Sequence, residues 1–260
     1  MKSTCKNCGH HYEGNFCNSC GQTSNTKDIN FGSILQEIQH GILQIDKGIL
    51  FTTKELLTRP GHTIREYLYG KRVKHFKPFA YILVLSTIYV LVTKFSHKTT
   101  FLEEIFRGMT DGMTDGENDK SKENLDFFVS LLQWMKNNYA YTTLLTIPII
   151  SLASYWSFYK AKYNYFQHLI LNAYVAGQRT AVYLMLLPIV YFISDQKVDD
   201  MIDHFKIVIG ILLTFWSYYQ FFDKTKPISK ILLTVLTYVL MAIIFFVLLA
   251  TIVAVSEAQN

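Results

Sequence analysis

A long apolar block near the C-terminus runs from Ile231 to Val255 and reads ILLTVLTYVLMAIIFFVLLATIVAV. The block contains no charged residue and exceeds the roughly 20 residues that a helix needs to cross the hydrocarbon core of a bilayer. Four other segments are also long and apolar enough: residues 76–95, 139–159, 170–193 and 205–222. We therefore predict an all-α integral membrane protein of about five transmembrane helices, with residues 76–260 as its membrane domain.

The composition agrees with this class. The chain has 260 residues, of which 50% are hydrophobic and 17% are charged, whereas a soluble domain carries about 25% charged residues. The net charge of +5 could point to nucleic acid, but most of the excess lies just before the first apolar segment, where a membrane surface is the commoner partner. The first thirty residues lack the apolar core of a signal peptide, so we expect none.

All four cysteines lie within the first twenty residues, at Cys5, Cys8, Cys17 and Cys20. They form two Cys-x-x-Cys pairs, and a glycine follows each pair directly. A tight turn lets both thiolates of a pair face one ion, and two pairs supply four sulfurs in the tetrahedral arrangement that zinc prefers. We therefore predict a zinc-ribbon-like module over residues 1–26. The zinc would be structural, because it supplies roughly 10–16 kcal/mol of apparent folding free energy in modules of this size.

Other readings of the same cysteines are two disulfides, an iron site or a redox-active pair. The absence of a secretory signal favours a reducing compartment and hence zinc. His10 and His11 could replace a thiolate, although four cysteines already complete a site. Only Lys2, Lys6 and Lys27 are cations near the metal, which makes a nucleic-acid surface a poor expectation and a protein partner the better one.

Residues 27–75 are predicted to form an amphipathic, juxtamembrane helical segment. Apolar side chains recur every three or four residues between Phe31 and Leu57 and draw one stripe along a helix. A turn around Pro60 and a short helix that ends at Gly70 follow. We expect this segment to lie at the level of the lipid headgroups and against the membrane helices.

Four cations precede the first apolar segment within seven residues: Lys71, Arg72, Lys74 and Lys77. Such a collar attracts anionic lipid by about 1 kcal/mol per charge and keeps its end of the helix in the cytoplasm. We predict that these four residues contact anionic headgroups and set the topology. A specific site for one headgroup or phosphate is the alternative.

The loops between the apolar segments alternate in charge. Residues 96–138 and 195–203 are mainly acidic, whereas residues 160–162 and 224–230 are basic. Because loops rich in lysine and arginine stay in the cytoplasm, the N-terminus and the zinc-ribbon-like module are predicted to be cytoplasmic and the C-terminus outside.

Polar residues mark one face of the third apolar segment. His168, Asn172 and Arg179 recur at intervals of four and seven residues, and Gln178 lies beside Arg179. An arginine at the centre of a membrane costs roughly 2.5–3.5 kcal/mol unless it is paired or hydrated, so this face must turn inward. It is either a polar packing seam between helices or a pathway for a ligand, lipid headgroup or ion. Candidate partners in the last two segments are Tyr218, Tyr219, Gln220, Thr234, Thr237 and Tyr238.

Short motifs follow one another along the chain: the doubled Cys-x-x-Cys-Gly, Arg59-Pro60-Gly61, Gly70-Lys71-Arg72 and Pro78-Phe79. In this order they resemble a family of bacterial multi-pass membrane proteins that is known only as a domain of unknown function. Gln167-His168 is similar as well, although an acidic residue would be expected at Gln167. The resemblance covers nearly the whole chain. It implies a protein of the bacterial inner membrane and carries over no activity.

No enzyme motif accompanies these features: the chain lacks the zinc-protease HExxH and the hydrolase GxSxG, and no carboxylate lies at membrane depth for a proton relay. We therefore favour a non-enzymatic sensor, scaffold or effector whose cytosolic zinc module binds a protein partner. A channel, transporter or lipid-handling protein that uses the polar face is the second hypothesis, and an enzyme acting on lipid within the membrane is the third. A homo-oligomer is compatible with each of them.

Overall fold

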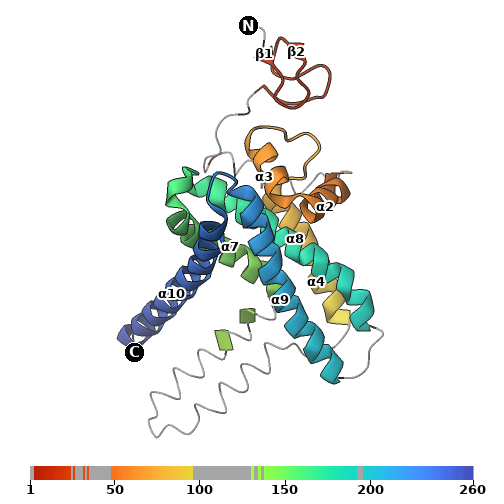
Figure 1. Cartoon of the computed structure of the whole chain (residues 1–260). Helices are drawn as coiled ribbons and strands as arrows, with labels where there is room; N and C mark the ends of the chain where they lie inside the picture. The colour runs from red at the N-terminus through yellow and green to blue at the C-terminus, as the bar shows by residue number, and fades with distance from the viewer. Residues whose placement is uncertain are drawn as a thin grey trace, which may run out of the picture.

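The computed structural model of the chain is mostly helical (Figure 1). It describes residues 3–24, 26, 32, 34, 48–95, 130, 131, 134, 135, 138–191 and 196–259. These residues contain seven α-helices and a two-stranded sheet at the N-terminus. The helical class with an N-terminal cysteine module is therefore confirmed. Most of the acidic loop predicted at 96–138 lies outside the described residues. So does the first part of the amphipathic segment, residues 27–47 apart from 32 and 34.

The N-terminal module is built on two short antiparallel strands, β1 (Ser3–Thr4) and β2 (His11–Tyr12), with Ser3 opposite Tyr12. The two cysteine turns repeat one hydrogen-bond pattern. The amide of the first cysteine binds a carbonyl five residues later, and the glycine amide binds back to that cysteine. Gly9 and Gly21 have φ angles of 76° and 74°, a region that glycine enters without a Cβ clash.

Two short helices follow, α2 (Gly48–Thr58) and α3 (Pro60–Leu68). Pro60 is the first residue of α3 rather than part of a longer turn, which suits a residue that has no N–H to leave unpaired at a helix start. After α3 the chain reverses at Gly70, whose φ angle is 104°. The sequence thus predicted a short helix that ends at Gly70, but it predicted a turn around Pro60, where α3 already begins.

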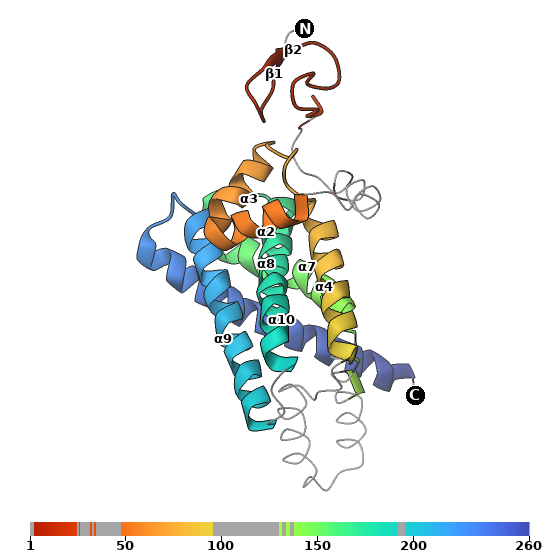
Figure 2. The ribbon, with the colours of Figure 1, turned by 90° about the vertical axis from the view of Figure 1, so that its right-hand side faces the viewer.

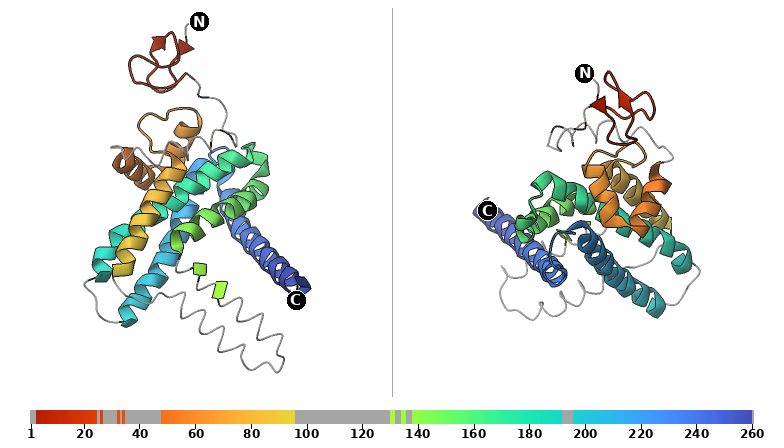
Figure 3. Two further views of the ribbon diagram at one scale, coloured as in Figure 1. Left: turned by 180° about the vertical axis from the view of Figure 1, so that it is seen from behind. Right: turned by 45° about the horizontal axis from the view of Figure 1, so that its top comes forward.

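Five longer helices form the body: α4 (Pro78–Phe95), α7 (Tyr139–Ser157), α8 (Tyr165–Tyr191), α9 (Gln196–Phe221) and α10 (Pro227–Gln259). A short 3-10 turn, η1 (Tyr159–Ala161), separates α7 from α8. Figure 2 shows α8 between α4 and α9, with α2 and α3 across one end of this group. α10 packs mainly on α7 and points away from α9, so its C-terminal end stands apart from the other helices (Figure 3).

Each of the five predicted segments falls on one of these helices, but α8, α9 and α10 run beyond the apolar stretches. α9 begins at Gln196 and so takes in most of the acidic stretch predicted as a loop at 195–203. Among the described residues, only α10 is long and apolar enough to cross a membrane by itself, over Pro227–Leu248. α4 is apolar over a shorter stretch, Pro78–Thr93. Only 11% of the apolar stretch of α10 is buried, unlike the core helix of a soluble protein.

The basic connections lie at one end of the helical body. Arg65 of α3 comes within 3.7 Å of Asp223, which lies in the turn between α9 and α10. The ring of Tyr163, in the connection between α7 and α8, lies 4.6 Å from the ring of Phe221 at the end of α9. The connections that contain Lys160 and Lys224 are therefore on the same side as α2 and α3. The largest buried cluster lies beneath these two helices, where Leu56 and Tyr67 meet α8 and α9.

Candidate functional site

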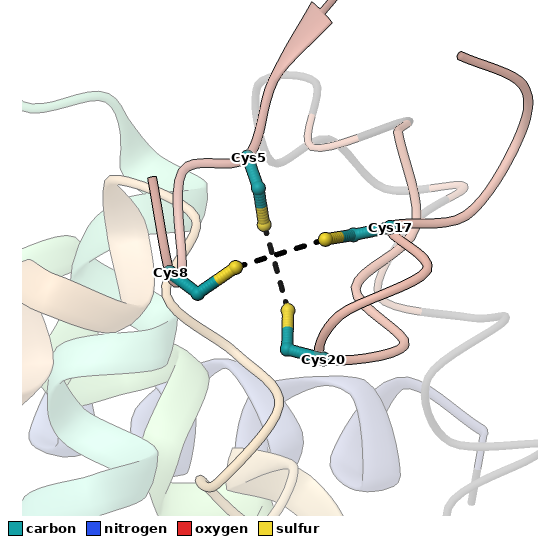
Figure 4. A group of neighbouring side chains, drawn as sticks. All are labelled: Cys5, Cys8, Cys17 and Cys20. Carbon is teal, nitrogen blue, oxygen red and sulfur yellow. Dashed lines mark hydrogen bonds between the residues drawn. The ribbon is translucent and has the colours of Figure 1, made fainter. Parts of the chain in front are cut away.

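The four cysteines predicted as metal ligands come together in the N-terminal module. Their sulfurs all lie within 4.8 Å of one another. The Sγ atoms of Cys5 and Cys20 are 3.5 Å apart, and those of Cys8 and Cys17 are 3.7 Å apart (Figure 4). These distances are far longer than the roughly 2.05 Å of a disulfide. The four residues are therefore free thiols arranged around a common point.

The donor set fits a soft, tetrahedral cation such as zinc. A hydrogen bond from the backbone N–H of Gln22 lowers the pKa of Cys20 to about 7. The backbone N–H of His10 favours the thiolate of Cys8, but burial and the three neighbouring sulfurs raise the pKa of Cys8 to about 11. Sulfurs this close cannot all ionise unless a cation neutralises them. His10 and His11 are not part of the cluster, and His11 Nδ1 lies 3.0 Å from the hydroxyl of Thr4.

The Arg59-Pro60-Gly61 motif forms the joint between α3 and the end of α9. The Arg59 guanidinium lies 2.5 Å from Glu55 and 3.5 Å from Glu66, which ties α2 to α3. A Cβ atom on Gly61 would collide with the backbone of Phe221, so only glycine allows α3 to approach α9 this closely. The N–H of Gly61 donates to the Gln220 side chain at 3.2 Å.

Arg65 is the structural residue that sequence reasoning missed. Its buried guanidinium donates to the carbonyl of Gln220 and, at 2.8 Å, to that of Phe221. The last carbonyls of a helix have no partner within the helix, and a cation at this end also interacts favourably with the helix dipole. A signal was present, because Arg65 directly follows Ile64 and lies at the edge of the apolar side of this short helix.

Two residues of the polar face predicted on the third segment, His168 and Asn172, bind side chains of neighbouring helices, although the buried Nε2 of His168 has no hydrogen-bond partner in the described part of the chain. The Asn172 amide donates to the hydroxyls of Ser151 and Ser154, at 3.1 and 3.2 Å, and its oxygen accepts from the Tyr218 hydroxyl at 2.7 Å. Ser154 also lies 2.9 Å from His168 Nδ1. We call these five residues the polar seam; they join α7, α8 and α9.

Gln178 and Arg179, the other polar residues predicted for this face, lie elsewhere on α8. Gln178 donates to the Leu56 carbonyl of α2 and accepts from Ser217 of α9, both at 2.8 Å. Arg179 is half-buried, and its side chain passes Gly210 of α9.

Of the partners expected in the last two segments, Tyr218 is the one that reaches the polar seam. Gln220 instead accepts from Gly61 in the joint, and the carbonyl of Tyr219 accepts from Lys230. The hydroxyls of Thr234 and Thr237 bind carbonyls of their own helix. The serines of α7 were not expected as partners, because serine is common in apolar helices and nothing in the chain marks which face it occupies.

The four cations of the collar differ in their surroundings. Lys71 pairs with Glu66 at 3.2 Å. Arg72 donates from Nε to the Tyr67 carbonyl at 3.2 Å, and its backbone N–H donates to Gln22 of the cysteine module at 3.3 Å. Lys74 is exposed and Lys77 is half-buried.

Comparison with known proteins gives one match. Residues 46–90 match the family model described as a protein of unknown function (DUF3667). No curated protein and no solved structure matches the chain. The matched residues cover α2, α3 and most of α4, and thus the joint with its Arg59-Pro60-Gly61 motif. Over these residues the match agrees with the resemblance inferred from the sequence, which is to a family whose function is unknown; the doubled Cys-x-x-Cys-Gly motif lies outside the match.

Proposed function

We propose that this chain is a multi-pass protein of the bacterial inner membrane that serves as a non-enzymatic sensor, scaffold or effector. In this proposal α4, α7, α8, α9 and α10 are the five transmembrane helices. The N-terminus is cytoplasmic and the C-terminus is outside. The cysteine module holds a structural zinc ion and binds a cytosolic protein partner.

Exposed apolar side chains support the membrane part of the proposal. Large residues face outward along α9 and α10, among them Phe205, Leu212, Leu232 and Phe246. In water such a surface would cost about 25 cal/mol per Å² of apolar area, whereas lipid removes this cost. The position of the basic connections on the side of α2 and α3 agrees with a cytoplasmic location of that side.

Two buried amides that bind protein groups at both ends are the observation that favours a binding role over a transport role. Both ends of the Asn172 amide bind protein groups, and so do both ends of the Gln178 amide. Groups that line a pathway must exchange these bonds with water or a ligand, and here the protein itself supplies them. The seam thus resembles the interhelical hydrogen bonds that hold membrane bundles together.

The cysteine module, by contrast, offers a free surface. Phe16 is 62% exposed although it lies beside the buried Cys17. Its backbone is fixed by a bridge to Thr23, so the ring is presented from an ordered position. Exposed aromatic side chains on a rigid support are typical anchors of protein interfaces. Zinc in this module would order the backbone that presents Phe16 and take no part in a reaction.

Capture of partners from membranes tests the proposal. Wild-type protein is expected to capture a cytosolic protein that Phe16→Ser and the double variant Cys5→Ser/Cys8→Ser both lose. Tyr69→Ser is the matched control, because Tyr69 is an equally exposed aromatic residue (64%) outside the module. Phe16→Ser should keep its zinc. Equal capture by wild type and by the double cysteine variant would contradict the proposal.

Reporter fusions test the topology separately. A reporter at Asp115 and another at the C-terminus should be active only outside the cytoplasm, and one at the N-terminus only inside. Cytoplasmic activity at Asp115 would contradict the five-helix arrangement.

A further inference from the structure

The loop between α3 and α4 holds two polar groups around one aromatic ring. The Arg72 guanidinium carbon lies 5.2 Å from the centre of the Tyr67 ring. The His75 ring lies 6.4 Å from the same centre and 5.4 Å from the ring of Phe51 in α2. The loop is held in place, because the His75 amide binds the Arg72 carbonyl at 3.2 Å and the Phe76 amide binds Thr52 at 2.8 Å.

Both side chains have a buried polar atom without a hydrogen-bond partner in the described part of the chain: Arg72 Nη2 and His75 Nδ1. A buried donor left unpaired costs about 1–3 kcal/mol, and more when it is charged. Burial lowers the pKa of His75, so the imidazole is neutral at pH 7 and can present an N–H at Nδ1. Two unsatisfied groups on one loop indicate a missing ligand better than either does alone.

The carboxylates nearby are already occupied. Glu66 accepts from Lys71 at 3.2 Å and from Arg59 at 3.5 Å, and Glu55 accepts from Arg59. Arg72 therefore has no carboxylate partner among the described ion pairs. An anion that satisfies Arg72 would have to come from outside this part of the protein.

We propose that Arg72 and His75 bind the phosphate group of an anionic phospholipid at the cytoplasmic surface. The inference rests on the membrane topology in the proposed function, but not on the protein partner. A planar guanidinium presents its N–H groups in a fork that matches phosphate oxygens, and the imidazole adds one donor.

A lipid headgroup suits the site better than soluble phosphate, because apolar residues lie beside it. Val73 is exposed between Arg72 and Lys74, and Leu50 of α2 is 80% exposed. A Cβ on Gly48 would lie 3.4 Å from the carbonyl oxygen of Lys74, so the start of α2 lies beside this loop. Apolar side chains that interleave with cations at a helix entrance are typical of interfacial binding.

Thermal unfolding of the purified full-length protein in neutral detergent tests the site. Added phosphatidylglycerol, but not phosphatidylcholine, is expected to raise the Tm, because a ligand that binds only the folded state stabilises it. Arg72→Gln and His75→Gln should each remove roughly half or more of this shift. Lys74→Gln removes a cation from the same loop, but from an exposed position, and should keep most of the shift. Arg72→Lys keeps the charge but not the planar fork, and should behave like Arg72→Gln.

Three results would overturn the inference. An equal loss in Lys74→Gln would mean diffuse attraction to the collar rather than a site. An equal shift from inorganic phosphate without lipid would exclude a lipid headgroup as the preferred ligand. No lipid-dependent shift in the wild type would exclude the site altogether, and His75→Gln keeps the test valid if Arg72→Gln does not fold. If the lipid test fails, the proposal that Phe16 captures a protein partner still stands. If the Asp115 reporter is active in the cytoplasm, the topology on which both proposals rest is wrong.

Discussion

The cysteine cluster and the polar seam were both identified from polar residues at regular spacing, but the structure separates them. The cluster gathers four thiols within 4.8 Å, and sulfurs this close ionise together only around a cation. The seam gathers Asn172, Ser154 and Tyr218 and satisfies the amide at both ends. A buried amide that the protein satisfies at both ends indicates internal packing, whereas four clustered thiols are a donor set that a metal ion completes. The cluster is therefore suited to a metal ion, and the Asn172 amide of the seam is suited to helix packing.

Removal of the metal should have the largest effect on stability. This effect should be confined to the N-terminal module. Cys5→Ser/Cys8→Ser leaves two thiolates, so zinc should be lost together with roughly 10–16 kcal/mol of apparent folding free energy in the module. Zinc content measures the first effect, and amide exchange at Tyr12 and Cys17 measures the second. Exchange protection in α8 should stay at its wild-type level, because the seam uses no group from the module.

His10→Ala/His11→Ala is the control for this experiment, since neither imidazole belongs to the cluster. The double histidine variant should retain one zinc ion per chain. Loss of zinc in the histidine variant, or loss of protection in α8 of the cysteine variant, would show that the two regions are not independent.

The joint between α3 and α9 should be the next most sensitive position. Gly61→Ala places a methyl group against the backbone of Phe221, which cannot yield as a flexible side chain could. Overpacking of this kind costs about 1–3 kcal/mol and occasionally more. Thermal or denaturant unfolding in detergent measures the loss.

Gly48→Ala is the matched control, because a Cβ at Gly48 would have its nearest neighbour at 3.4 Å. Alanine in a helix is also favoured over glycine by up to about 1 kcal/mol, so this variant should be neutral or stabilising. If both variants had the same stability, the close approach of α3 to α9 would be wrong.

Some features of the fold and of the candidate site could be predicted from the sequence, and others could not. The apolar segments predicted the positions of the five long helices, because a helix that is buried or in contact with lipid needs apolar residues along most of its length. The cysteine spacing predicted the cluster, because both ligands of a pair lie within one turn. Arg65 and Ser154 were missed because the spacing of residues does not identify their partners. Only the packing of α3 on α9 and of α7 on α8 brings Arg65 to Phe221 and Ser154 to His168.

Coupling inside the seam is the smallest effect and the most specific test of internal packing. Asn172→Ala and Ser154→Ala remove the two sides of one hydrogen bond of 3.2 Å. Each variant alone should destabilise the bundle. The double variant should cost less than the sum by about 0.5–1.5 kcal/mol, because residues in contact are not additive. The free energies of unfolding in detergent of the wild type, the two single variants and the double variant give this coupling energy.

A control double-mutant cycle uses Ser86→Ala in place of Ser154→Ala, again together with Asn172→Ala. Ser86 is as buried as Ser154, but its hydroxyl donates to Leu83 of its own helix, α4. With Asn172→Ala it should be additive to within about 0.3–0.5 kcal/mol, as expected of residues without a shared partner. A seam that only packs helices requires coupling in the first cycle and none in the second. If Asn172 served a ligand instead, Asn172→Ala would leave stability unchanged and Ser154→Ala would show no coupling to it, so the channel or lipid-handling role would become the better explanation.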